Sequence, residues 1–303
     1  MKAKTYASPV AFKRALEDRL KGASASGVDF ARRRQLLVFD RFLARVAVTF
    51  GDAVVLKGGL VLELRLERAR TTKDIDLRLP APSSDVLDKL QAAGQFALGD
   101  FMVFEVRPNR DHPEIAGDDV PYDGYRYQAA CQLAGKIYGQ SFGVDVAFGD
   151  PVLGEVDVVT ADDMLAFAGV APPALRLYPV ETHLAEKLHA YTLPRKRPNS
   201  RVKDLPDLAL LGTIRRLDAS NVRAALERVF SFRRVQPLPM RLPEPPADWE
   251  VPYERMAEQD GLPWRTLAEV EAAARGFLDP LLADKIDGWW EPASWAWSGT
   301  NDG

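Results

Sequence analysis

The amino-terminal part of the chain alternates apolar and polar positions with a helical spacing. Residues 9–20 and 29–50 place apolar side chains every three to four positions, which predicts two amphipathic helices. We expect these helices to cover a sheet that is formed by the segments after them. The apolar stripe of the longer helix is predicted to contain Phe30, Leu36, Leu37, Phe39, Phe42, Leu43, Val46 and Val48.

A strand, a glycine turn, a helix and a second strand are predicted after the long helix. Residues 54–57 are a short apolar run, Gly58 and Gly59 form the turn, residues 60–68 have helical spacing, and residues 73–79 alternate. A lone pair of glycines is usually only a turn. The complete order of elements is more specific than any of its parts.

Two acidic residues share one face of the second strand. Because side chains alternate across a strand, Asp74 and Asp76 lie on one face, whereas Ile75 and Leu77 lie on the other. Carboxylates this close repel each other unless a cation lies between them, and Mg²⁺ suits them if phosphate oxygens complete its octahedron. The glycine turn could bind those phosphates through its N–H groups. The alternative is a solvated strand edge.

A third acid lies in a predicted strand at residues 143–148. Asp145 is flanked by Val144 and Val146, and a carboxylate among apolar residues is costly to ionise without a cation. We therefore predict that Asp145 is a third metal-facing carboxylate on a strand beside the first two acids. The alternatives are an acid at a strand end or a salt bridge to an arginine.

The rest of the pattern predicts further strands and then a helical region with a tryptophan-rich tail. The tail is too aromatic to stay free in water, so at least part of it should dock. The predicted elements are a helix from Ser83 or Ser84 to about Leu98, strands at 101–107 and 125–133, helices at 181–191, 203–211, 218–230 and 266–282, and an extended proline-rich strap at 236–252.

Composition limits the class of protein. The chain has 303 residues, of which 47% are hydrophobic and 27% are charged, and this composition excludes general disorder. Its net charge of −3 argues against nucleic-acid binding over the whole surface. A local basic track remains that could meet a phosphate-rich substrate, or could simply be a solvated loop. This track consists of Arg195, Lys196, Arg197, Arg201 and Lys203.

Other classes of site are excluded by residue counts. The single cysteine, Cys131, is predicted to be a buried small residue, and three histidines with one cysteine cannot form a structural zinc site. The amino terminus lacks the apolar core of a signal peptide, and no run approaches the length of a membrane span. We expect a cytoplasmic protein.

Four short segments carry a resemblance to a known family. They are Leu56-Lys57-Gly58-Gly59, residues 70–77 around the Asp-x-Asp pair, residues 186–190 (Glu-Lys-Leu-His-Ala), and residues 201–208 (Arg-Val-Lys-Asp-Leu-Pro-Asp-Leu). Together they resemble the AbiEii/AbiGii group, which are nucleotidyltransferase toxins of abortive-infection type within the DNA polymerase β superfamily. The similarity extends from about residue 30 to about residue 283, and its motifs are specific jointly.

The resemblance implies an α/β (α+β) fold, in which helices flank a nucleotidyltransferase-type mixed sheet and the carboxy-terminal lobe is mainly helical. We expect the chain to divide into amino-terminal helices at 1–50, a core at 51–160, a helical lobe at 161–235, and a strap, closing helix and tail at 236–303. The resemblance also implies an NTP substrate, Mg²⁺ and nucleotidyl transfer. Some relatives modify the acceptor end of tRNA, and a cognate antitoxin is a possible partner.

The resemblance also assigns roles to individual residues. Asp74 and Asp76 would hold the metal, Lys187 would bind the triphosphate, and Asp204 or Asp207 would be the acid of the last motif. The nucleotide would contact Lys57, Gly58, Gly59 and Thr72. The superfamily commonly has Gly-Ser at the glycine pair, so a serine contact is missing here.

Simpler interpretations stay open for two of these residues. Lys187 could be an exposed helix lysine paired with a nearby glutamate. Asp204 could be no more than the N-cap of a helix that has Pro206 in its first turn.

Three functions are compatible with the sequence. The leading hypothesis is a toxin that transfers nucleotides from an NTP to RNA, such as the 3′ end of tRNA. The second is transfer to a protein or small molecule by the same site. The third is a catalytically silent relative that binds nucleotide or a partner chain and regulates.

Overall fold

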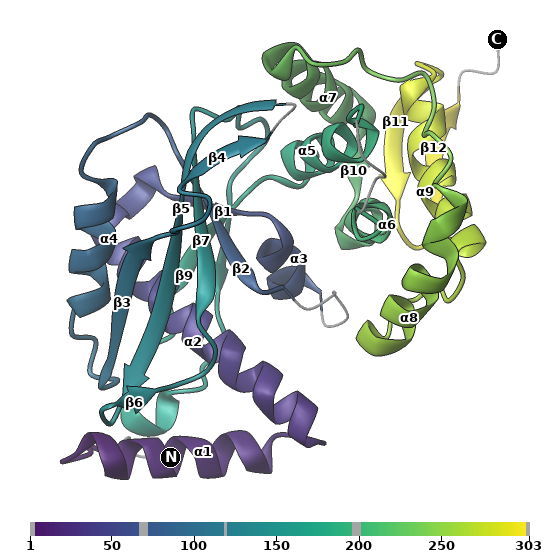
Figure 1. Cartoon of the computed structure of the whole chain (residues 1–303). Helices are drawn as coiled ribbons and strands as arrows, with labels where there is room; N and C mark the ends of the chain where they lie inside the picture. Colours follow the sequence, from purple (N-terminus) through teal and green to yellow (C-terminus); the bar gives the residue numbers. More distant parts are fainter. Residues whose placement is uncertain (1–3, 67–71, 118–119, 196–200, 301–303) are drawn as a thin grey trace.

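The computed structural model describes residues 4–66, 72–117, 120–195 and 201–300, which form two lobes (Figure 1). Within these residues, the amino-terminal lobe is a mixed sheet of nine strands flanked by helices. The carboxy-terminal lobe is mainly helical and contains a small sheet of three strands. The predicted mixed α/β fold is confirmed.

The large sheet has β2 at its centre. Its strands are β1 (Val55–Lys57), β2 (Asp74–Leu79), β3 (Met102–Pro108), β4 (Glu114–Gly117), β5 (Val120–Leu133), β6 (Lys136–Ile137), β7 (Phe142–Phe148), β8 (Asp157–Thr160) and β9 (Ala174–Leu177). Their order is β3-β5-β7-β2-β1-β9-β8, and β4 and β6 pair with β5. β2 is parallel to β7 and antiparallel to β1. The sheet continues to β9, beyond residue 160, where we predicted that the core ends.

The α-helices that accompany this sheet in the described part of the chain are α1 (Pro9–Gly22), α2 (Gly27–Phe50), α3 (Gly59–Arg65) and α4 (Val86–Gln95). The long α2 lies across one face of the sheet, and α1 crosses its lower end (Figure 1). Both long helices were predicted, and the Ser26 hydroxyl caps α2 by accepting the N–H of Asp29 at 3.1 Å. Most of the predicted α2 stripe is buried, but Val48 is 56% exposed, so that assignment was wrong.

Several helix boundaries differ from the prediction by a few residues, and side-chain contacts accompany two of these differences. α3 ends at Arg65 and not at Arg68, and the Arg65 guanidinium bonds to Asp157 and to the carbonyl of Tyr178. α4 begins after Asp85, and the hydroxyl of Ser83 donates to that aspartate instead of capping the helix.

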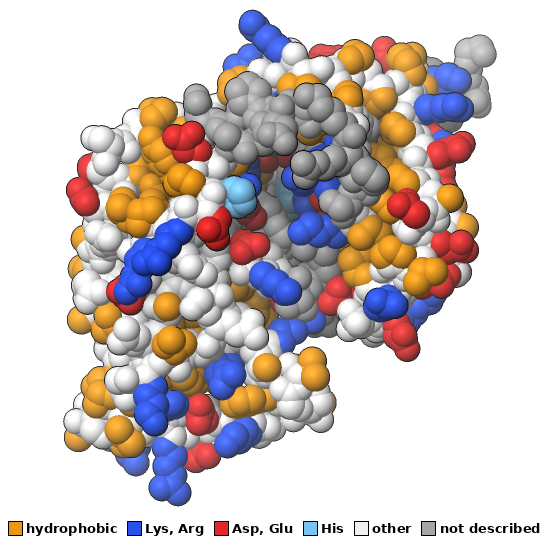
Figure 2. Space-filling view, viewed as in Figure 1, with side chains coloured by type: hydrophobic (Ala, Val, Ile, Leu, Met, Phe, Trp, Pro, Cys, Tyr) orange, Lys and Arg blue, Asp and Glu red, His pale blue; other side chains and the backbone are white. Residues whose placement is uncertain are grey.

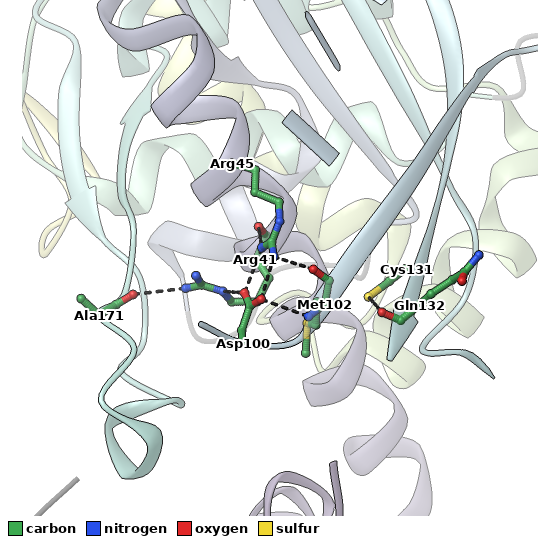
Figure 3. Close-up of polar contacts among 7 residues, drawn as sticks. All are labelled: Arg41, Arg45, Asp100, Met102, Cys131, Gln132 and Ala171. Carbon is green, nitrogen blue, oxygen red and sulfur yellow. Dashed lines mark hydrogen bonds and ion pairs between the residues drawn. The ribbon is translucent and has the colours of Figure 1, made fainter. Parts of the chain in front are cut away.

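A buried charge cluster fastens α2 to the segment before β3 (Figure 3). Arg45 donates to Asp100 at 2.6 Å, and Arg41 donates to the same carboxylate at 2.7 Å. These three side chains are at most 4% exposed. Cys131 lies near this cluster, is fully buried as predicted, and has its pKa raised to about 12 by burial. The thiol is therefore not a nucleophile at neutral pH.

The carboxy-terminal lobe forms its own hydrophobic core. The apolar side of α5 packs on α6 and α7, and α6 packs on α9. Asp218 caps α7 by accepting the N–H of Asn221, and Thr266 and Glu269 form a reciprocal capping box at α9. The elements are α5 (Val180–Thr192), α6 (Asp204–Ile214), β10 (Leu217–Asp218), α7 (Ala219–Arg233), α8 (Glu250–Asp260), α9 (Leu267–Leu282), β11 (Ile286–Glu291) and β12 (Ala296–Thr300).

The proline-rich strap is shorter than predicted. Residues 250–260 form α8, so the prediction of an extended segment to Pro252 was wrong. Pro252 lies in the first turn of α8, where its missing N–H costs no helical hydrogen bond. The tryptophan tail docks as predicted: Trp290 donates to the Gly212 carbonyl at 2.7 Å, and Trp297 donates to the Phe277 carbonyl at 2.8 Å.

The two lobes have separate apolar cores that meet at α3. Leu60 and Val61 of α3 belong to the core of the amino-terminal lobe, whereas Leu62 belongs to the other. None of the helices in the described part of the chain has the length and apolar character that crossing a membrane requires.

Candidate active site

Three carboxylates lie on adjacent strands and on the same face of the large sheet. Ile75 and Leu77 of β2 are buried in the core, so Asp74 and Asp76 lie on the opposite face, as predicted. Asp145 of β7 lies in register with Asp76 in a parallel pairing. The prediction that Asp145 lies on a strand beside the Asp-x-Asp pair is confirmed.

Two glycines make room for the β2 carboxylates. A side-chain Cβ at Gly58 would lie 2.6 Å from the Cγ of Asp76, and a Cβ at Gly143 would lie 2.6 Å from Oδ1 of Asp74. The Gly143 N–H also donates to that Oδ1 at 3.2 Å. The glycine turn and β7 therefore fix the positions of both acids.

Asp145 shares the field of the other two acids and is paired with an arginine. Burial and then the negative charge of Asp76 raise the pKa of Asp145 to about 6, with a smaller contribution from Asp74 and an opposing one from Arg126. Arg126 of β5 donates to Asp145 at 3.2 Å. The salt bridge that we named as an alternative thus exists beside the acidic pair.

The donor set suits a hard divalent cation that is shared with phosphate oxygens. Among the described residues, no group of three or more Asp, Glu, His or Cys side chains is arranged to hold a metal ion by itself. Asp74 and Asp76 nevertheless offer carboxylate oxygens on one face, and the negative charge of Asp76 adds to the effect of burial on the pKa of Asp145. The arrangement fits a cation whose remaining ligands come from a substrate.

The glycine turn leads directly into α3. Gly58 is the N-cap with φ +72° and ψ −159°, a conformation that is nearly restricted to glycine. The first N–H groups of a helix have no helical acceptor, so the turn can present backbone donors to an anion. Because α3 has only 7 residues, we attribute this capacity to the N–H groups more than to the helix dipole.

Lys187 is held by two buried acids across the α5–α6 contact. Its Nζ lies 3.0 Å from Asp204 and 2.7 Å from Asp207, whose side chains are fully buried. The alternative of an exposed lysine paired with a glutamate was therefore wrong, because its side chain is 12% exposed. Asp204 is the first residue of α6 and makes no capping bond, so the N-cap interpretation was also wrong.

His183 lies one turn before Lys187 on α5. It is buried, and neither ring nitrogen has a hydrogen-bond partner among the described residues. Burial, followed by the positive charge of Lys187, lowers the pKa of His183 well below its usual value. The ring is therefore neutral, and the ammonium is the positive group on this part of α5.

α3 connects the acidic strand with the lysine cluster, because it packs against both β2 and α6. Figure 2 shows acidic and basic side chains gathered where the two lobes meet on the face in view. The last two residues of the basic track lie beside the lysine cluster: Arg201 pairs with Asp204 at 3.4 Å, and Lys203 is exposed. Arg195 donates to the carbonyl of Ala190. Lys196 and Arg197 lie outside the described residues.

Two predicted nucleotide contacts have protein partners. The Nζ of Lys57 lies 2.5 Å from Asp150 and 2.9 Å from Glu186. The N–H of Thr72 donates to Glu63 at 3.2 Å, and its hydroxyl donates to the carbonyl of Asp74 at 3.4 Å. Both residues thereby hold the segments that flank the glycine turn and the acidic strand.

An apolar cavity of about 220 Å³ lies on the other face of the sheet. Its lining includes Leu43 of α2, Leu56 of β1 and Leu77 of β2. Because Leu77 points away from the acids of β2, this cavity does not belong to the acidic site.

Several residues that shape the site were not predicted from the sequence. Gly143 could have been noticed, because a glycine inside a strand often marks a close approach. Arg126, Asp150 and Arg233 gave no local signal, because their partners are distant in sequence. Arg233, for example, donates to Asp150 at 2.8 Å across 83 positions.

Comparison with solved structures finds a fold similar to that of a nucleotidyltransferase toxin. MenT4, a nucleotidyltransferase toxin from Mycobacterium tuberculosis H37Rv, matches with a TM-score of 0.61 and 19% identity over 93% of this chain and 92% of that chain. JHP933 from Helicobacter pylori matches with a TM-score of 0.46 and 14% identity over 86% of this chain and 94% of that chain. At these identities, the likeness to MenT4 concerns the fold.

Sequence comparison identifies the family. No curated protein matches the chain. The family model for the nucleotidyl transferase AbiEii toxin of type IV toxin–antitoxin systems matches residues 41–275, which include the glycine turn, the acidic strand and the Lys187 cluster. The chain therefore belongs to the AbiEii family of nucleotidyltransferase toxins.

Proposed function

We propose that the protein transfers a nucleotidyl group from an NTP to RNA, with the 3′ end of tRNA as acceptor and Mg²⁺ as cofactor. The observation that carries this proposal is the shared face of Asp74 and Asp76 beside the Gly58 turn. Family membership supports the reaction class.

Asp74 and Asp76 would hold the cation, and Asp145 would add negative charge from the neighbouring strand. A bound Mg²⁺ would neutralise charge on the transferred phosphate. The N–H groups of Gly58 and Gly59 would donate to phosphate oxygens of the NTP. These contacts position the α-phosphorus for in-line attack.

Lys187 would stabilise the leaving pyrophosphate. An acceptor hydroxyl forms a new O–P bond at the α-phosphorus, and the bond to the β-phosphate oxygen breaks, so negative charge grows on the pyrophosphate. Asp204 and Asp207 hold the Lys187 ammonium in place, which supplies a preorganised positive charge. A carboxylate of this site would accept the proton of the attacking hydroxyl.

The exposed cations beside this cluster support a nucleic-acid acceptor. Arg201 and Lys203 lie immediately before α6, whose first residues hold Lys187. Cations placed this close to a transfer site would bind the phosphates of an RNA end. The net charge of −3 restricts this attraction to a local track.

The test is transfer of label from NTPs that carry it on the α-phosphate. The purified protein is incubated with Mg²⁺ and separated tRNA, protein and metabolite fractions from a bacterial lysate. We expect label in tRNA, and no label with Asp74→Ala or Lys187→Ala. Asp52→Ala is the control, because the Asp52 side chain is 93% exposed and remote from this face.

Other results would refute parts of the proposal. Label in the protein or metabolite fraction, and not in tRNA, would show that the acceptor is a protein or a small molecule. NTP binding without label in any fraction would favour a silent regulator. In cells, expression should arrest growth, and Asp74→Ala should relieve the arrest.

A further inference from the structure

Three buried charged groups and one partly buried one, Glu186, form a closed ring between the two lobes. Lys57 pairs with Asp150 at 2.5 Å and with Glu186 at 2.9 Å. Arg233 pairs with the same two carboxylates, at 2.8 Å and 3.2 Å. Positive and negative groups alternate around the ring, so its formal charge is zero. All four side chains are at most 13% exposed.

Two members of the ring come from each lobe. Lys57 ends β1, and Asp150 follows β7 in the large sheet, whereas Glu186 lies on α5 and Arg233 ends α7. Tyr178, in the segment that joins the lobes, donates to the carbonyl of Pro151 at 2.7 Å and reaches Glu186 at 3.5 Å. The apolar cores of the two lobes are separate clusters, and the ring connects the lobes through charged side chains.

The ring adjoins both halves of the proposed site. Lys57 immediately precedes Gly58, whose turn packs on Asp76. Glu186 immediately precedes Lys187. Because neighbouring residues share a peptide bond, a shift of Lys57 moves the Gly58 turn, and a shift of Glu186 moves Lys187.

Stability alone does not account for such a ring. Taking charges out of water offsets much of their mutual attraction, and apolar side chains of similar size often stabilise a fold as well. Apolar contacts have no fixed direction. Charged partners form hydrogen bonds with fixed directions, so they permit only one arrangement of the elements that they connect. A ring of this kind specifies a geometry.

We propose that Asp150, Glu186 and Arg233 are positioning residues that set the spacing between the acidic strand with its glycine turn and Lys187. One NTP must contact both halves, so the spacing controls how well the triphosphate is bound. This inference rests on the proposed function for its kinetic consequence. Its structural consequence, a fixed distance between the lobes, is independent of that function.

The test compares two arginines of equal burial. Arg233→Met opens the ring, whereas Arg41→Met removes an arginine from the Asp100 cluster, which lies within one lobe (Figure 3). Both side chains are 4% exposed, and both bond to a buried aspartate. We expect Arg233→Met to raise the KM for NTP and lower kcat/KM by about 10- to 100-fold. Arg41→Met should lower stability and leave KM unchanged.

A double variant separates positioning from stability. In Arg233→Met/Glu186→Met, apolar side chains replace one pair of the ring, so thermal stability should recover towards that of the parent protein. The KM for NTP should stay raised. Recovery of KM together with stability would overturn the inference. Glu186→Gln retains the shape of its side chain and provides the same kinetic comparison if Arg233→Met does not fold.

The distance between the lobes is measured by pulsed electron paramagnetic resonance. Spin labels are attached at Lys136→Cys and Arg228→Cys, which are exposed positions on the two lobes, while Cys131 is buried and stays unlabelled. We expect a narrow distance distribution in the parent, a broader or shifted one in Arg233→Met, and no change in Arg41→Met.

The two readouts fail separately. Suppose that the parent protein transfers nucleotides. If neither Arg233→Met nor Glu186→Gln then changes the distance distribution or the KM for NTP, the ring does not position the lobes. If the parent protein transfers no nucleotide, the proposed function is wrong, and the distance distributions still decide whether the ring sets the spacing.

Discussion

Replacing Gly58 with alanine tests the contact between the glycine turn and the acidic strand. The new Cβ would lie 2.6 Å from Cγ and 2.9 Å from Cβ of Asp76, and closer still to Oδ2. Carbon atoms normally stay about 3.5–4.0 Å apart, so the carboxylate must move by about 1 Å. A displacement of about 1 Å in a reacting group can lower the rate by about 100-fold.

The same substitution also strains the backbone, and a matched glycine removes this part of the effect. Gly58 and Gly135 both have φ of +72°, but a Cβ at Gly135 would meet no atom within 4 Å. A non-glycine residue in such a conformation costs about 1–3 kcal/mol. Gly135→Ala should therefore lower the free energy of unfolding without reducing transfer activity.

The assay measures kcat/KM for nucleotidyl transfer and the free energy of unfolding for both variants. We expect both to lose stability, and only Gly58→Ala to lose about 100-fold in kcat/KM. Equal activity of the two folded variants would refute the claim that Gly58 is required to place Asp76.

Three further substitutions have expected outcomes. Burial and then the charge of Asp162 raise the pKa of Asp40 to about 7 in the folded protein. The unfolded chain therefore loses this proton at a lower pH than the folded protein does, so the free energy of unfolding of the parent falls as pH rises from about 4 to about 7. Urea unfolding should show that Asp40→Asn gains stability over the parent through this range, and an equal difference at pH 4 and pH 8 would contradict the reasoning. Thr266→Ala removes the capping box with Glu269 and should cost about 1 kcal/mol in urea unfolding. Gly143→Ala places a Cβ 2.6 Å from the nearest β2 carboxylate oxygen and should reduce transfer activity more than Gly135→Ala; equal rates would argue against a catalytic role for that acid.

Local patterns predicted the parts of the site that are continuous in sequence. Alternation placed Asp74 and Asp76 on one face, and the apolar flanks of Asp145 indicated a buried strand beside them. The two halves of the site were recognised because each is contained in a short segment. Strand registers such as Asp76 with Asp145 needed the fold, because pairing depends on residues far apart in the chain.

Contacts between distant segments could not be predicted in the same way. Nothing near Lys57 indicates that Asp150 and Glu186 surround it, since these partners lie 93 and more positions away. The helix at 250–260 was missed because five prolines nearby favour an extended chain, although Pro252 fits a first helical turn. Asp204 has a residue type that often caps helices, and the choice between capping and pairing with Lys187 depended on how α5 and α6 pack together.

Mg²⁺-dependent NTP binding tests the central claim most directly. Titration calorimetry with a non-hydrolysable NTP, with and without Mg²⁺, is performed on the parent, Asp76→Asn and the exposed control Asp52→Asn. We predict that Mg²⁺ strengthens NTP binding to the parent and to Asp52→Asn but not to Asp76→Asn. An equal effect of Mg²⁺ on all three proteins would contradict a cation held by the acidic face of β2.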